Sequence, residues 1–151
     1  MGMNDSDIAG VVATLKRQHR QIRRGFARVA RGGPHRDADW AKLRRLLAAH
    51  EAFEKARVHP VARKRVPAGD DVVVARLVEE ALAQRTVRQL GKLGPDDPRF
   101  PAMFRSLRRS VLMHARREER EEFAELRRAA AADGASRRGL ARLFGRVTRR
   151  R

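Results

Sequence analysis

Hydrophobic residues recur every three or four positions along almost the whole chain, and no stretch alternates for long as a β-strand would. This spacing predicts four helices of about 22 to 32 residues each. Capping residues, glycines and prolines mark their expected ends at positions 5–7, 32–34, 67–70, 94–98 and 133–134. Long helices joined by short turns are typical of an antiparallel bundle. We predict an all-α, up-down-up-down four-helix bundle over residues 1–135, followed by a basic amphipathic helical tail over 136–151.

Each predicted helix has one apolar face that would point into the bundle. Pro60 lies near the end of the second helix, where we expect a kink or a stop. The expected core positions are Ile8, Val11, Val12, Leu15, Ile22, Phe26, Val29, Trp40, Leu43, Leu46, Leu47, Phe53, Val58, Val61, Val73, Val74, Leu77, Val87, Leu90, Phe104, Leu107, Val111, Phe123 and Leu126. A chain of this length can bury one hydrophobic core of that size.

Polar residues interrupt all four apolar faces. In the first helix His19 lies four residues after Leu15 and three before Ile22, on the apolar seam itself. The other interruptions are His50 with Glu54 at i+4, Gln84, and His114 with Glu118 at i+4. The three histidines and Gln84 each fall near the middle of their helix, and helix midpoints share one layer in an up-down bundle. Three imidazoles and two carboxylates are therefore expected to meet inside the bundle.

A buried cluster of this kind needs a compensating partner. Glu54 and Glu118 are the only acidic residues that the pattern places on the seams, and a buried carboxylate is costly unless it is paired or binds a metal. Histidine nitrogen and glutamate oxygen are common metal ligands, and an i, i+4 pair directs both to the same place. Taken singly, each histidine could be a hydrogen-bonded core residue, and each His-x-x-x-Glu pair could be a surface ion pair. The duplication of the pair favours a metal site.

The two remaining histidines fall outside this cluster. His35 lies in the glycine-proline turn. His59 comes nine residues after His50, which is half a turn away from the ligand face at about 100° per residue. We expect both side chains to be exposed.

These motifs resemble those of the hemerythrin-like, or HHE cation-binding, domains. The matching pieces are Gln18-His19-Arg20, His50-Glu51-Ala52-Phe53-Glu54, His59-Pro60, and His114-Ala115-Arg116-Arg117-Glu118-Glu119 with Phe123 and Leu126, within residues 6–130. The resemblance implies a left-twisted bundle with a non-haem di-iron centre, in which Glu54 and Glu118 bridge the irons and the three histidines are terminal ligands. Members of the family bind oxygen, store or sense iron, or respond to peroxide and nitric oxide.

The chain departs from the family in the third helix, where members usually carry a histidine and this sequence has Gln84. An amide oxygen is a weaker ligand for iron than imidazole, so the second iron would keep fewer protein donors. Glu51, directly after His50, is a further weak candidate, because acidic residues at that position contribute in some relatives. The remaining positions on the irons are open to water, a small diatomic ligand or peroxide.

The charge of the chain supports an alternative interpretation. Thirty-six basic against eighteen acidic residues give a net charge of +18, and residues 136–151 hold seven arginines and no acidic residue. Such a tail is suited to non-specific polyanion contact, so the rival function is a basic helical protein that binds nucleic acid or an anionic membrane surface, with structural core histidines. One tryptophan and no tyrosine disfavour a single-strand reader.

Residues and motifs that the sequence lacks exclude several classes of site. The chain has no cysteine, which excludes a disulfide framework and a thiolate metal site, and no apolar run long enough for a transmembrane segment. We expect a cytoplasmic protein. No nucleophile lies beside a base and no glycine-rich phosphate loop is present, so any enzymatic activity would come from the metal, as peroxide disproportionation or oxidation of ferrous iron. Our leading interpretation is a protein that uses iron to bind or sense oxygen, peroxide, nitric oxide or iron itself, and whether it is an enzyme stays open.

Overall fold

The computed structural model describes residues 5–132 and 134–135, and this part of the chain is helical without a strand, as predicted. Its α-helices are α1 (Asp5–Arg31), α2 (Arg36–Phe53), α3 (His59–Arg65), α4 (Gly69–Leu93) and α5 (Phe100–Arg117). The π-helical segments η1 (Glu54–Val58) and η2 (Glu118–Glu122) directly follow α2 and α5. Helical backbone continues after η2 over 123–132. The predicted tail over 136–151 lies outside the described residues.

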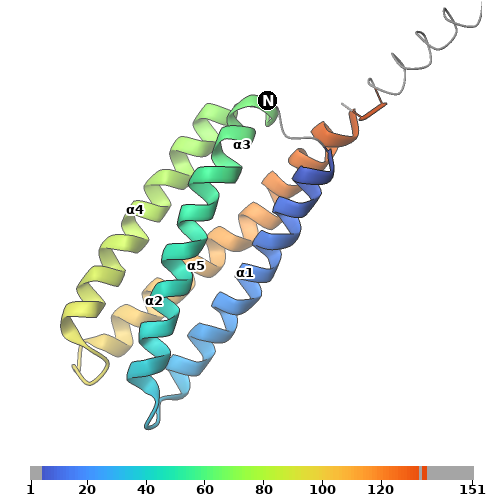
Figure 1. The fold of residues 1–151 in the computed structure, drawn as a ribbon. Helices are drawn as coiled ribbons and strands as arrows, with labels where there is room; N and C mark the ends of the chain where they lie inside the picture. The colour runs from blue at the N-terminus through green and yellow to red at the C-terminus, as the bar shows by residue number, and fades with distance from the viewer. Residues whose placement is uncertain (1–4, 133, 136–151) are drawn as a thin grey trace, which may run out of the picture.

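The described helices form four rods, namely α1, α2–η1–α3, α4, and α5 with η2 and its continuation. These rods lie side by side with short connections at their ends (Figure 1). α1 packs against α2, α3 against α4, and α4 against α5, while α1 also contacts α5. Short connections make successive rods neighbours, which agrees with the predicted helical bundle. None of the helices in the described part is long and apolar enough to cross a membrane.

The second rod runs past Pro60 and does not stop there. Pro60 lies in the first turn of α3, where a helix does not need the missing N–H, and the irregular backbone just before it is η1. The rod ends at Arg65. Gly69 then begins α4 so close to α3 that a Cβ atom would lie 2.3 Å from the Ala62 carbonyl oxygen. Glycine is therefore required for this tight connection.

Two hydrophobic clusters fill the bundle. The first includes Phe26, Trp40, Leu43, Phe100 and Phe104, and the second includes Ile8, Leu15, Val58, Phe123 and Leu126. Along α1 the boundary between them falls at His19, because Leu15 belongs to the second cluster and Ile22 to the first. A buried polar layer is thus enclosed by apolar side chains on both sides.

α4 presents a different face to the bundle from the one predicted. Val73 and Leu90 are buried as expected, but Val74 is 56% exposed. Arg76 and Glu80 are buried instead. They come three and seven residues after Val73 and share its side of the helix, whereas Val74 is turned away by about 100°. The inward face of α4 is therefore partly charged.

Candidate metal centre

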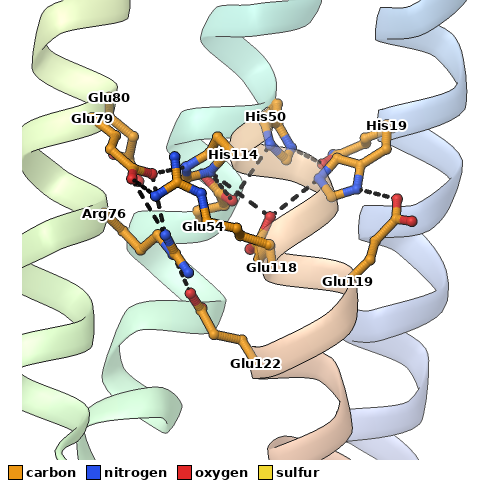
Figure 2. Close-up of polar contacts among 12 residues, drawn as sticks. His19, His50, Glu54, Arg76, Glu79, Glu80, His114, Glu118, Glu119 and Glu122 are labelled. Carbon is orange, nitrogen blue, oxygen red and sulfur yellow. Dashed lines mark hydrogen bonds and ion pairs between the residues drawn. The ribbon is translucent and has the colours of Figure 1, made fainter. Parts of the chain in front are cut away.

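Five side chains meet in the polar layer between the hydrophobic clusters (Figure 2). His19 comes from α1, His50 and His114 from the last turns of α2 and α5, and Glu54 and Glu118 are the first residues of η1 and η2. All five are buried, with at most 9% of any residue exposed. The structure thus brings together the residues that the apolar seams singled out.

The imidazole Nε2 atoms face the two carboxylates. His19 Nε2 lies 3.2 Å from Glu118 Oε2, and His50 Nε2 lies 3.4 Å from Glu54 Oε1. His114 Nε2 faces both, at 3.5 Å from Glu54 Oε1 and 3.8 Å from Glu118 Oε2. Ligands bound at about 2.1 Å and at right angles around one metal are about 3.0 Å apart. The spacing of these nitrogens and oxygens is close to what one cation requires.

Both glutamates occupy the same unusual backbone position. Glu54 and Glu118 each open a π-helical segment, in which the N–H of His59 donates to the Glu54 carbonyl and that of Phe123 donates to the Glu118 carbonyl. Such single π turns inside α-helices are frequent at functional sites. The apolar pattern alone did not predict them, although each adds one residue to a turn and so rotates the face of the helix that follows.

The outer nitrogen of each histidine is held by a separate acceptor. His19 Nδ1 lies 2.7 Å from Glu119 Oε1, His50 Nδ1 lies 3.0 Å from Gln18 Oε1, and His114 Nδ1 lies 2.8 Å from Glu79 Oε2. An acceptor at Nδ1 keeps the proton there and leaves the Nε2 lone pair directed at the centre. All three rings are therefore oriented as metal ligands would be.

Burial and the crowded carboxylates shift several pKa values. Burial lowers the pKa of His50 to about 4, against the attraction of Glu54, and burial raises the pKa of the Glu118 carboxyl to about 7. Burial also opposes charge on His114, but the neighbouring carboxylates of Glu54, Glu118 and Glu79 outweigh it and raise that pKa to about 9. In the protein without a cation, bound protons therefore supply part of the missing positive charge.

Several polar atoms in this layer have no hydrogen-bond partner. They are His19 Nε2, Glu118 Oε2 and both carboxylate oxygens of Glu54, all buried. Donor atoms of His19, His50, Glu54 and Glu118 lie within 4.8 Å of one another. Unsatisfied buried donors and acceptors are costly, and a cation placed among them would satisfy them together. The residues present therefore fit a bound metal ion.

Comparison with protein families gives a match that covers most of the chain. The hemerythrin HHE cation-binding domain family matches residues 10–126, which include all five clustered side chains. The chain belongs to this hemerythrin family. Comparison with curated proteins and with solved structures gives no significant match. Below, the hemerythrin-like centre means His19, His50, Glu54, His114 and Glu118.

The two weaker ligand candidates lie beside the hemerythrin-like centre and bind each other. Gln84 of α4 donates a hydrogen bond from its side-chain amide to the carboxylate of Glu51. Glu51 belongs to no group of His, Cys, Asp or Glu donors that converge closely enough to hold one ion, among the residues that the structure describes. The structure shows a hydrogen bond between Gln84 and Glu51, and their role as weaker ligands stays a prediction.

His59 is not exposed, contrary to the expectation from the sequence. Only 5% of the residue is exposed, and its Nε2 lies 2.8 Å from Glu80 Oε1. The prediction failed because the second rod is packed on two sides, against α1 and against α4. A residue half a turn from the ligand face can therefore still be buried, here towards α4. His35 is exposed, as expected.

Four charged residues around the hemerythrin-like centre were missed. Glu80 and Glu122 are buried, so Glu54 and Glu118 are not the only acidic residues on the seams, and buried Arg76 bonds to Glu122 and lies 3.2 Å from Glu79 Oε2. A signal was present in the sequence, because Arg76 and Glu80 follow Val73 at i+3 and i+7. Figure 2 shows Arg76, Glu79, Glu80 and Glu122 beside the centre.

A cavity of about 230 Å³ leads to the centre between α2, α4 and α5. His50, Glu54 and His114 lie on its wall, together with apolar side chains that include Ala83 and Val111. Its lining also contains Leu82 and Met113, two of the large hydrophobic side chains that are exposed to solvent. The cavity thus connects the hemerythrin-like centre with the surface through mainly apolar walls.

Proposed function

We propose that this chain holds a non-haem iron centre, with two irons, and uses it to bind or sense a small molecule. In this proposal His19, His50 and His114 are terminal ligands, and Glu54 and Glu118 are shared between the irons. The observation that carries the proposal is the set of buried, unpartnered atoms of His19, Glu54 and Glu118, which converge with a donor of His50 within 4.8 Å. The bundle supporting it would have successive rods running in opposite directions.

The donor chemistry supports iron. Imidazole and carboxylate together suit iron and related first-row divalent ions, whereas the sequence offers no thiolate for a softer site. Bound iron would supply Lewis acidity and electron-transfer chemistry. The protein would supply fixed Nε2 lone pairs, carboxylate charge, and two hydrophobic clusters that limit the access of water.

The cavity supports a role for an external ligand. Five protein donors do not fill two six-coordinate shells, so positions stay open on the cations. A diatomic molecule or peroxide can reach them through the mainly apolar cavity between α4 and α5. Any enzymatic activity of this chain would follow from such access, as disproportionation of peroxide or oxidation of ferrous iron.

Anaerobic loading with Fe²⁺ tests the proposal. Metal-free protein is titrated with Fe²⁺, excess metal is removed, and bound iron is counted by elemental analysis. We expect two irons per chain in wild type and loss of iron in His19→Ala, with the helical circular dichroism signal retained. Protein that retains no iron would overturn the proposal.

A second candidate function is contact with a polyanion. Arg105, Arg108, Arg109 and Arg116 of α5 surround a shallow surface hollow, and none has a carboxylate partner within the described part of the chain. Salt-dependent DNA binding by the chain without 136–151, whose net charge falls from +18 to +11, would separate this surface from the tail. An unchanged salt slope would place the contact outside residues 136–151, where these arginines of α5 are candidates.

A further inference from the structure

Three buried side chains form a second group of possible metal ligands beside the hemerythrin-like centre. Glu54 opens η1, His59 opens α3, and Glu80 lies in the middle of α4. Each offers one donor atom, and these atoms lie within 4.8 Å of one another. Glu54 also belongs to the centre already described. The two groups therefore share one carboxylate.

Oxygen atoms in this group have no hydrogen-bond partner despite their burial. Glu80 Oε2 and both oxygens of Glu54 are unpartnered, and neither residue is more than 5% exposed. Glu80 Oε2 lies 3.8 Å from Nζ of the half-exposed Lys55, beyond hydrogen-bond distance. His59 Nε2 lies 2.8 Å from Glu80 Oε1, close to the spacing of about 3.0 Å between neighbouring ligands on one metal.

Helix α4 and the second rod supply this ligand pair beside the centre. Gln84 of α4 donates its amide to Glu51. One turn earlier, Glu80 directs a carboxylate inward, and His59 brings an imidazole from the neighbouring rod. Together His59 and Glu80 offer one nitrogen and one oxygen donor on the α4 side of the centre.

We propose that His59 and Glu80 complete the ligand set of the second cation of the centre, beside Glu54, which both cations share. This inference rests on the proposed function, because it uses the same Glu54. The ion would be a divalent first-row metal such as Fe²⁺ or Mn²⁺, since two carboxylates and one imidazole form a predominantly oxygen donor set. Lys55 occupies the outer side of Glu80 and competes with the ion for its charge.

Metal counting separates this site from a purely structural His59–Glu80 ion pair. Metal-free wild type, His59→Gln, Glu80→Gln and the exposed control Glu121→Gln are titrated with Mn²⁺ by calorimetry and elemental analysis. We expect two ions in wild type and in the control, and one ion in each of the two site variants. Two ions in Glu80→Gln, or a single ion in wild type that both site variants retain, would overturn the inference while the first site stands. Wild type that binds no ion would overturn the proposed function as well.

Two further measurements add a half-exposed variant and a spectrum of the wild-type protein to the metal counts of the buried variants. Lys55→Met removes the competing ammonium from a half-exposed position, so we expect the second Mn²⁺ to bind about tenfold more tightly, whereas a structural ion pair predicts no gain. Two Mn²⁺ ions that share Glu54 should give an exchange-coupled electron paramagnetic resonance spectrum. In Glu80→Gln this spectrum should revert to the six-line signal of one ion. Unchanged affinity in Lys55→Met together with uncoupled spectra in wild type would contradict the proposal.

Discussion

The two sides of the hemerythrin-like centre are built differently. On the side of α1, α2 and α5, three histidines face the two glutamates, and each has its Nδ1 fixed by an acceptor. Helix α4 itself carries no histidine; its Arg76 and Glu79 pair with each other, its Glu80 pairs with His59 of α3, and a cavity opens to the surface. The first side is a preorganised set of candidate ligands, because its side chains need little rearrangement to receive a cation.

Side chains of α4 orient one histidine of the centre and border the cavity that leads to it. Glu79 of α4 accepts from His114 Nδ1 and also lies 2.8 Å from Arg117 Nη1, so this helix orients a ligand that it does not carry. The cavity on the same side has His50 and His114 on its wall. The comparison indicates that α4 orients His114 and borders the cavity, whereas the five candidate ligands of the hemerythrin-like centre come from the other three rods.

The largest expected effect is on the preorganised side. Glu54→Ala and Glu118→Ala should each abolish stable metal loading, because each removes the carboxylate that faces two histidines and neutralises cation charge. Circular dichroism should still show a helical protein, and elemental analysis should show no retained iron. Glu121→Ala, which removes an exposed glutamate of η2, is the matched control. Normal iron content in either site variant would contradict the ligand assignment.

A smaller effect is expected from the acceptors behind the histidines. Glu119→Ala removes the partner of His19 Nδ1, so the ring loses its fixed orientation. Loss of such a partner lowers metal affinity by about 10- to 100-fold. Calorimetric titration with Fe²⁺ or Mn²⁺ measures it, with Glu125→Ala on the same rod as control. Equal affinities in the two variants would show that His19 does not depend on Glu119.

Filling the cavity should alter access and leave metal content unchanged. In Ala83→Phe the larger side chain projects into the space between α4 and α5 and obstructs the route to the centre. We expect slower nitric oxide binding to the iron-loaded protein in stopped-flow absorption. Val74→Phe places the same ring on an exposed part of α4 that does not line the cavity. Identical rates in the two variants would mean that ligands enter elsewhere.

The smallest effect is expected at Gln84. Because its amide is bound to Glu51, Gln84→His should leave the iron content unchanged and destabilise the fold by about 1 kcal/mol through an imperfectly satisfied polar group. Thermal unfolding and elemental analysis measure both quantities. Gln89→His, on an exposed position of α4, should change neither. A gain of iron in Gln84→His would show that this position is open to the metal.

Periodicity predicted most of the described fold and brought the central side chains to one layer. His19, His50 and His114 interrupt apolar faces near helix midpoints, and the glutamates at i+4 from His50 and from His114 follow from helix geometry alone. Predictions for α4 were weaker, because its inward face is narrow and mixes Val73 with Arg76 and Glu80. In such a pattern, the sequence does not show whether a charged residue is exposed to solvent or is buried against a partner on another rod.

The sequence by itself determined the helices, their short connections and the histidine–glutamate pairs, since these depend on spacing within one rod. Tertiary structure decided the rest. His59 is buried against Glu80, and Gln84 bonds to Glu51. Each of these two contacts joins residues more than twenty positions apart, on different rods. Such contacts depend on which rods are neighbours and how each is rotated about its axis. Apolar periodicity sets that rotation only approximately, and the π turns shift it further.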